Sequence, residues 1–137
     1  AAGLSRYGLQ EEVLTVLRGL FDASEHVELC RMPELFCGFH RRPGQGATLY
    51  PVACAPQAWA AAAVFLLLEA CLGLEIDGRC GRITLRRPRL PDFLREVRVE
   101  NLRVGPTSVD LLFERHPADV GVSVLRRDGE IEIIVIK

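Results

Sequence analysis

The sequence lacks an excess of charge of either sign. It carries 17 basic and 18 acidic residues, so its formal net charge at pH 7 is -1. A protein that holds nucleic acid or an anionic membrane through its overall field needs a strongly basic balance, which this chain does not have. The arginines between Arg82 and Arg103 alternate with apolar residues and have few aromatic neighbours to stack on bases, which is typical of a solvated strand face. We therefore expect neither a nucleic-acid partner nor a membrane partner.

Metal and redox motifs are lacking as well. The five cysteines are odd in number, widely spaced and without a Cys-x-x-Cys pair, which disfavours a zinc site and a disulfide framework and indicates a reducing, cytoplasmic compartment. The three histidines, His26, His40 and His116, lie far apart in the sequence and are expected to be solvated. The sequence has no phosphate-binding glycine loop, Gly-x-Ser-x-Gly elbow or His-Glu-x-x-His motif. We expect no metal and no organic cofactor.

What the sequence does have is a globular composition, with 137 residues of which 49% are hydrophobic and 26% charged. Residues 1–24 predict a tight helical hairpin. Residues 1–7 resemble the last turns of a helix that ends at Gly8, and apolar residues then recur at helical spacing up to about Ser24. Because no start signal precedes the first helix, we expect the chain to begin inside a helix.

The run 56–72 predicts a helix that is apolar on all sides. Pro56 suits a first helical turn and Gly73 the position just after the end, and only Gln57 and Glu69 between them are strongly polar. Such a helix must be covered all round, yet it falls short of the roughly 20 apolar residues that a membrane span needs. Either the protein forms a homo-oligomer through this helix, or the rest of a larger helical domain lies upstream. We favour the upstream domain.

The segment 27–55 is expected to be a long loop with short extended pieces, because prolines interrupt each stretch. A connection of this length in a compact domain is usually functional or disordered. Its apolar residues argue for order, and hence for a function of the loop; they are Leu35, Phe36, Phe39, Leu49 and Tyr50.

The last third of the chain predicts strands. Residues 82–87 alternate as a strand, and four further runs follow, at 97–104, 108–115, 120–127 and 130–136. Asp128-Gly129 is a two-residue hairpin signal, so we expect the last two runs to pair and the whole to form an antiparallel meander. The alternation slips between Val99 and Leu102, which predicts a bulge near Glu100-Asn101. The fold class is therefore α+β, with a helical hairpin and one buried helix followed by a small antiparallel β-meander.

Two residues of the loop are of types that could take part in catalysis. Glu34 follows a proline and is flanked by apolar residues that would desolvate it, an environment that suits a general base. The alternative is a loop glutamate bonded to a helix end or to an arginine such as Arg41. Cys37, with His40 three residues on, would need a third orienting group to act as a nucleophile; none is evident, and a structural cysteine is the favoured interpretation.

The same loop carries a family resemblance. Pro-Glu-Leu-Phe-Cys-Gly-Phe at 33–39 and Tyr-Pro-Val-Ala-Cys-Ala-Pro-Gln-Ala-Trp-Ala-Ala at 50–61 resemble the C-terminal end of bacterial amylo-alpha-1,6-glucosidase-like proteins. These are glycogen-debranching-type members of the six-hairpin, (α/α)6-barrel glycosidases. The likeness extends through Pro-Arg-Leu-Pro at 88–91 and Asn-Leu-Arg-Val-Gly at 101–105 to the end of the chain.

The resemblance implies that the chain is the truncated end of such a barrel, residues 1–75, followed by a β appendage, residues 76–137. It implies hydrolysis of α-glucosidic linkages, in inverting fashion, with Glu34 as the general base and the general acid on an upstream hairpin. The isolated chain would then be inactive. It also implies an α-glucan or oligosaccharide as substrate and the upstream barrel segment of the same protein as partner. Residues of the motifs that could stack on or contact the sugar are Phe36, Phe39, Tyr50 and Trp59.

Two other classes of function fit the same sequence. The first is a non-catalytic carbohydrate-binding module, in which the loop 27–55 and the sheet hold glycan. The second is a dimerisation module that pairs through the apolar run 56–72. Hydrolysis of a glucan by the intact parent protein would distinguish a glycosidase from these two classes, neither of which is catalytic.

Overall fold

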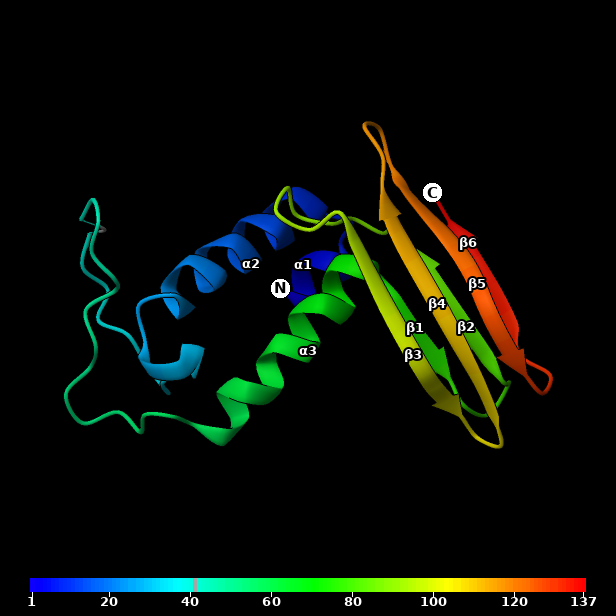
Figure 1. Ribbon diagram of the computed structural model, residues 1–137, viewed down its shortest axis with the longest axis horizontal. Helices are drawn as coiled ribbons and strands as arrows, with labels where there is room; N and C mark the ends of the chain where they lie inside the picture. Colours follow the sequence, from blue (N-terminus) through cyan, green and yellow to red (C-terminus); the bar gives the residue numbers. More distant parts are fainter. Residues whose placement is uncertain (41) are drawn as a thin grey trace.

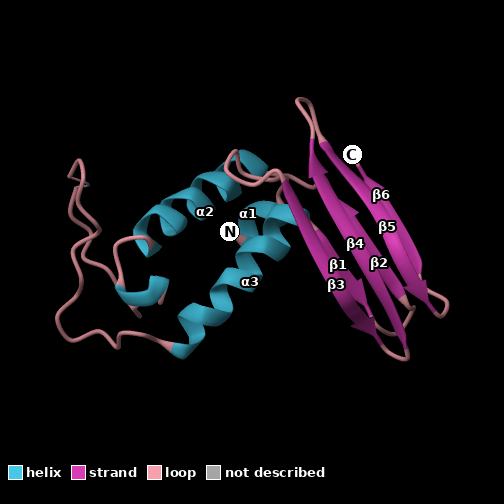
Figure 2. Cartoon of the chain, in the orientation of Figure 1, coloured by secondary structure: helices cyan, strands magenta, loops and turns pink. Residues whose placement is uncertain are grey.

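The structure is a computed structural model, and it describes residues 1–40 and 42–137. A helical region comes first and a region of strands follows, so the protein is mixed α+β (Figures 1 and 2). The loop between the second and third helices lies at the end of the helical region that is farthest from the strands (Figure 1).

The helical region contains the predicted hairpin. It consists of α1 (Ala2–Arg6), α2 (Gln10–Ser24) and α3 (Ala58–Leu72). Gly8 lies between α1 and α2 with a φ of 75°, the left-handed conformation that the sequence predicts there. The start of α3 differs from the prediction by two residues. Gln57 has extended dihedral angles and caps the helix through its own Oε1, which accepts the Ala58 N–H at 3.1 Å, so Pro56 lies before the helix.

Gly73 ends α3 and joins the two regions. Its φ is 57°, and a Cβ at this position would lie 1.9 Å from the carbonyl oxygen of Arg86. The Gly73 carbonyl in turn accepts the Arg86 N–H at 2.9 Å. Only glycine allows the end of the helix to approach the neighbouring strand this closely.

The strands form two three-stranded sheets. In spatial order, the first contains β1 (Leu74–Asp77), β2 (Arg82–Arg86) and β6 (Glu132–Ile136), and the second contains β3 (Glu96–Val104), β4 (Thr107–Arg115) and β5 (Val120–Asp128). The second sheet is the antiparallel meander that the sequence predicts. Its bulge is confirmed, because the register shifts between Val99 and Leu102, where Asn101 has a φ of 54°.

The predicted pairing of the last two strands is wrong. β6 does not fold back on β5; it crosses to the other sheet and runs parallel to β2, with Ile83 opposite Ile133. Burial explains the difference: Ile131, just after the turn, is 6% exposed and joins the core that the two sheets share. The turn at Gly129 therefore redirects the chain between sheets. The sequence patterns also do not predict the short strand β1.

Two apolar cores divide the molecule. Residues from both sheets make one core, in which Leu85 of β2 and Phe113 of β4 are fully buried. Residues of α2 and α3 make the other, around Val13 and Cys71. The expected division into residues 1–75 and 76–137 stays a prediction, because the cores meet within α3, where Cys71 belongs to one and Leu72 to the other.

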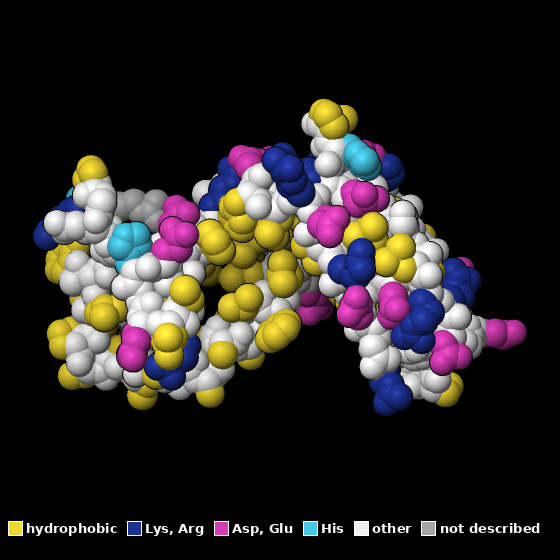
Figure 3. All heavy atoms as spheres, in the orientation of Figure 1, with side chains coloured by type: hydrophobic (Ala, Val, Ile, Leu, Met, Phe, Trp, Pro, Cys, Tyr) yellow, Lys and Arg dark blue, Asp and Glu magenta, His cyan; other side chains and the backbone are white. Residues whose placement is uncertain are grey.

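Much of α3 is uncovered. Its C-terminal residues from Leu67 onward supply its buried positions, whereas Trp59 is 67% and Phe65 75% exposed. Apolar side chains accordingly gather in the open space between α2 and α3 (Figure 3). Within the described residues, no helix combines the length and the apolar character that crossing a membrane requires.

Candidate functional site

A cavity of about 750 Å³ lies between α2, α3 and the loop that connects them. The two helices pack together around Val13 and Cys71, and the cavity opens between them beyond this core, toward the start of α3. Its walls are mostly apolar, and Glu34 is the one acidic side chain among the residues that line it. A concave, mostly apolar space with a small number of polar groups is the usual form of a ligand site.

Main-chain hydrogen bonds hold Glu34 in place. Its N–H donates to the carbonyl of Cys54 at 2.9 Å, and its carboxylate Oε2 accepts the Cys54 N–H at 3.2 Å. Within residues 1–40 and 42–137, no donor reaches the other carboxylate oxygen, Oε1. The half-buried carboxylate thus has one oxygen fixed by the backbone and one available to accept a proton or a hydrogen bond.

These contacts also bear on the alternative interpretation of Glu34. The carboxylate bonds to the backbone of the loop at Cys54, not to a helix end. Arg41, the other partner that the sequence suggests, lies outside the described residues.

Two of the aromatic residues that the resemblance singles out share the cavity with Glu34. Phe36 lies in an extended piece of the loop, which pairs with Leu49 as an isolated β-bridge. Trp59 is the second residue of α3 and projects from it with 67% of its surface exposed. Both rings present apolar area that could pack against an apolar ring face of a ligand.

The structure places the other two aromatic residues elsewhere. Phe39 is 69% exposed and lines a separate cavity of about 550 Å³ together with His26 and His40. Tyr50 is 46% exposed in the loop. Of the predicted site residues, all of which the structure describes, only Glu34, Phe36 and Trp59 line the cavity between α2 and α3.

Comparisons of the chain with protein-family models, with curated proteins and with solved structures find no match. The candidate site therefore rests on its own geometry and on the sequence resemblance. Among the residues that the structure describes, no three His, Cys, Asp or Glu side chains are grouped so that they could hold a metal ion.

Sequence reasoning missed the contribution of α2 to this cavity. Leu17, Leu20 and Phe21 line it from the side opposite to α3. Their helical spacing predicts a common apolar face, but the pattern alone cannot say that part of this face borders an open space and not a packed core.

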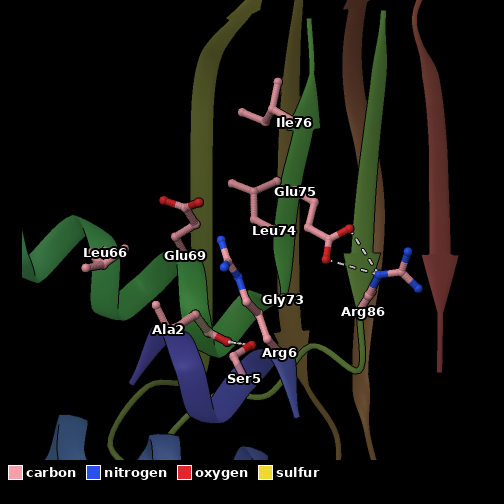
Figure 4. Close-up of a pocket in the computed structure, with 11 residues that line it drawn as sticks. Ala2, Ser5, Arg6, Leu66, Glu69, Gly73, Leu74, Glu75, Ile76 and Arg86 are labelled. Carbon is pink, nitrogen blue, oxygen red and sulfur yellow. Dashed lines mark hydrogen bonds and ion pairs between the residues drawn. The ribbon is translucent and has the colours of Figure 1, made fainter. Parts of the chain in front are cut away.

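A second cavity, of about 610 Å³, lies between α1, α3 and β1 (Figure 4). It is more polar: Arg86 pairs with Glu75 at 3.0 Å, and Arg6 and Glu69 extend into the same space. Its Ser5 hydroxyl already donates to the carbonyl of Ala70 at 2.9 Å. Because Arg86, Glu75 and Ser5 already have partners and none of the lining residues is a predicted site residue, the cavity around Glu34 is the better candidate.

Proposed function

We propose that this chain is the C-terminal part of a glycoside hydrolase that cleaves α-glucosidic linkages, of the amylo-alpha-1,6-glucosidase type, and that Glu34 is its general base. The observation that carries the proposal is the Glu34 carboxylate at an apolar cavity, with Oε2 held by the Cys54 N–H and Oε1 without a partner in the described chain. The sequence resemblance at 33–39 and 50–61 supplies the reaction class.

In this proposal Oε1 of Glu34 accepts a proton from a water molecule as that water attacks the anomeric carbon. A general acid from a part of the protein outside this sequence protonates the leaving oxygen. An inverting reaction requires these two carboxyl groups to be about 6.5–9.5 Å apart, so that the water fits between them. Phe36 and Trp59 pack against the sugar, and no cofactor takes part.

The proposal also accounts for the uncovered face of α3. In an (α/α)6 barrel, α1, α2 and α3 contact further helices of the same polypeptide, and those helices cover side chains such as Phe65, which is 75% exposed here. The strands from 76 onward form an appendage that braces the barrel. The isolated chain has one of two catalytic carboxylates and is inactive, and the enzyme acts in the cytoplasm.

The test uses the intact parent protein and a panel of α-glucans and branched dextrins. Glu34→Gln keeps the shape of the side chain and removes the base, so kcat for glucose release is expected to fall about 100-fold or more while the protein stays folded. Glu28→Gln, in an exposed glutamate of the same loop, is the matched control and retains activity. Activity that is independent of Glu34 contradicts the role of this residue.

One observation favours a second candidate, a dimerisation module. The face of α3 around Phe65 is exposed and apolar along most of the helix, as a homo-oligomeric interface would be. This candidate predicts a stable dimer of the intact protein and no hydrolysis of any glucan. Glucose release by the parent protein decides between the two.

A further inference from the structure

We infer that Phe21 is a third aromatic wall of the Glu34 site and that Phe93, from the strand region, positions it. This inference rests on the proposed function, because it assigns Phe21 a contact with the sugar substrate. It concerns two residues to which neither the motifs nor the resemblance assigns a role.

Phe21 borders the cavity from the α2 side, opposite to Trp59 of α3. Its ring stacks on the ring of Phe93, with the centroids 4.4 Å apart and an interplanar angle of 17°. One ring face is therefore covered by Phe93, yet 43% of Phe21 remains exposed. The uncovered part of the ring is what an occupant of the cavity meets.

A second contact joins the same two segments. Arg18 precedes Phe21 by one helical turn, and its guanidinium pairs with the carboxylate of Asp92 at 2.8 Å. Both side chains of this pair are well exposed, so the pair contributes little to stability, and the stack of Phe21 on Phe93 is the principal contact. Asp92 and Phe93, which are neighbours in the chain, thus contact Arg18 and Phe21 on one side of α2.

The segment that carries Phe93 is itself fixed. It connects β2 to β3, and Pro91 within it is fully buried, with Leu90 beside it only 4% exposed. The Leu94 N–H closes a turn onto the carbonyl of Pro91 at 3.0 Å. Phe93 is therefore held in place by the strand region. Because its ring stacks on Phe21, it fixes where Phe21 lies at the wall of the cavity.

A ring that stacks on an apolar sugar face binds the substrate and the transition state about equally. Loss of such a contact raises KM and leaves kcat unchanged. Phe21 is accordingly a substrate-contacting residue and Phe93 a positioning residue, whereas Glu34 acts on kcat. A variant of Phe21 or Phe93 therefore changes KM, whereas a variant of the base Glu34 changes kcat.

The experiment compares variants of the intact parent protein with maltooligosaccharide as the probe. Phe21→Ala is expected to raise KM about 2- to 10-fold, the range of one aromatic contact, with kcat unchanged. Phe93→Ala is expected to raise KM by a smaller factor. Phe93→Tyr keeps the stack, so its KM is expected to equal that of the wild type. Tyr7→Ala is the control, since Tyr7, just after α1, is 87% exposed. Asp92→Asn, which removes the ion pair only, is expected to resemble the wild type.

The outcomes separate this inference from the proposed function. If the wild type releases no glucose from any glucan, the proposed function fails whatever the variants do. If the wild type is active and Phe21→Ala leaves KM unchanged, the role of Phe21 is overturned. A fall in kcat with unchanged KM in Phe93→Ala would show a structural loss of active enzyme, and it would overturn the positioning role. Weaker equilibrium binding of maltooligosaccharide by Phe21→Ala in a Glu34→Gln background would support the inference independently of turnover.

Discussion

The strand region and the helical region bury their apolar residues to very different degrees. In the strand region Ile83, Leu85 and Phe113 are all 0% exposed, within a core that both sheets share. In the helical region Val13 and Cys71 reach the same burial, but Trp59 is 67% and Phe65 75% exposed on the same helix as Cys71. The strands thus bury their core almost entirely among themselves, with Leu72 of α3 added, whereas the helices leave much of α3 uncovered.

The difference follows from the two kinds of pattern. In β4 the apolar residues Val109, Leu111 and Phe113 alternate with Asp110 and other residues that face outward, so one sheet face suffices to bury them. The helix α3 is apolar all round, and its neighbours α1, α2 and β1 cover only part of it. An all-round apolar helix needs partners on every side, whereas an alternating strand needs them on one.

The largest expected effect lies in the core between the sheets. Phe113→Ala removes a fully buried ring, and it is expected to lower the free energy of unfolding of this chain by about 3–5 kcal/mol. Phe65→Ala, the same substitution on the uncovered face of α3, is expected to change it by less than about 0.5 kcal/mol. Urea unfolding followed by circular dichroism measures both. Equal losses would contradict the contrast between the regions.

The next effect is expected at the junction of the two regions. Gly73→Ala places a Cβ 1.9 Å from the Arg86 carbonyl oxygen at a φ of 57°, and it is expected to cost about 2 kcal/mol or more in the same measurement. Gly78→Ala is the matched control, because no neighbouring atom lies within 4 Å of its Cβ position. A neutral Gly73→Ala would mean that helix and strand separate there without cost.

A smaller effect is expected on self-association of the isolated chain. The exposed apolar face of α3 should drive association, and Phe65→Glu is expected to weaken it about tenfold, as sedimentation measures. Leu125→Glu is the control, since Leu125 is 49% exposed on β5 of the strand region. If Leu125→Glu weakens association as strongly, the sheets and not α3 carry the contact.

The smallest effect concerns pH and the strand region alone. The guanidinium of Arg126 and the N–H of Asn101 lower the pKa of Asp110 below its ordinary value. A group whose pKa is lower in the folded state stabilises the fold above its unfolded pKa, near 3.8, and this stabilisation is lost as the pH falls below that value. Asp110→Asn is expected to be slightly less stable than the wild type at pH 7, and the difference is expected to shrink as the pH falls below 3.8 and through the lowered pKa of the folded state. A difference independent of pH would rule out charge as its source.

The sequence predicted the local elements better than their long-range pairing. Gly8 and Gly73 marked the ends of helices correctly, because their left-handed conformations are local properties. The pairing of β6 depended on the burial of Ile131 between two sheets, and a hairpin signal such as Asp128-Gly129 carries no information on that. For the site, the motifs contain three residues that line the cavity, Glu34, Phe36 and Trp59, whereas the stack of Phe21 on Phe93 joins residues that are 72 positions apart, which no local pattern predicts.

The position of Trp59 has a practical consequence. It is the single tryptophan of the chain, and it lies at the cavity with 67% of its surface exposed. Its emission therefore reports on the helical region and on whatever enters the cavity, while the core between the sheets contains no tryptophan. The protein carries a built-in optical probe of its candidate site, and a ligand that fills the cavity will shift the emission toward the blue without any label being attached.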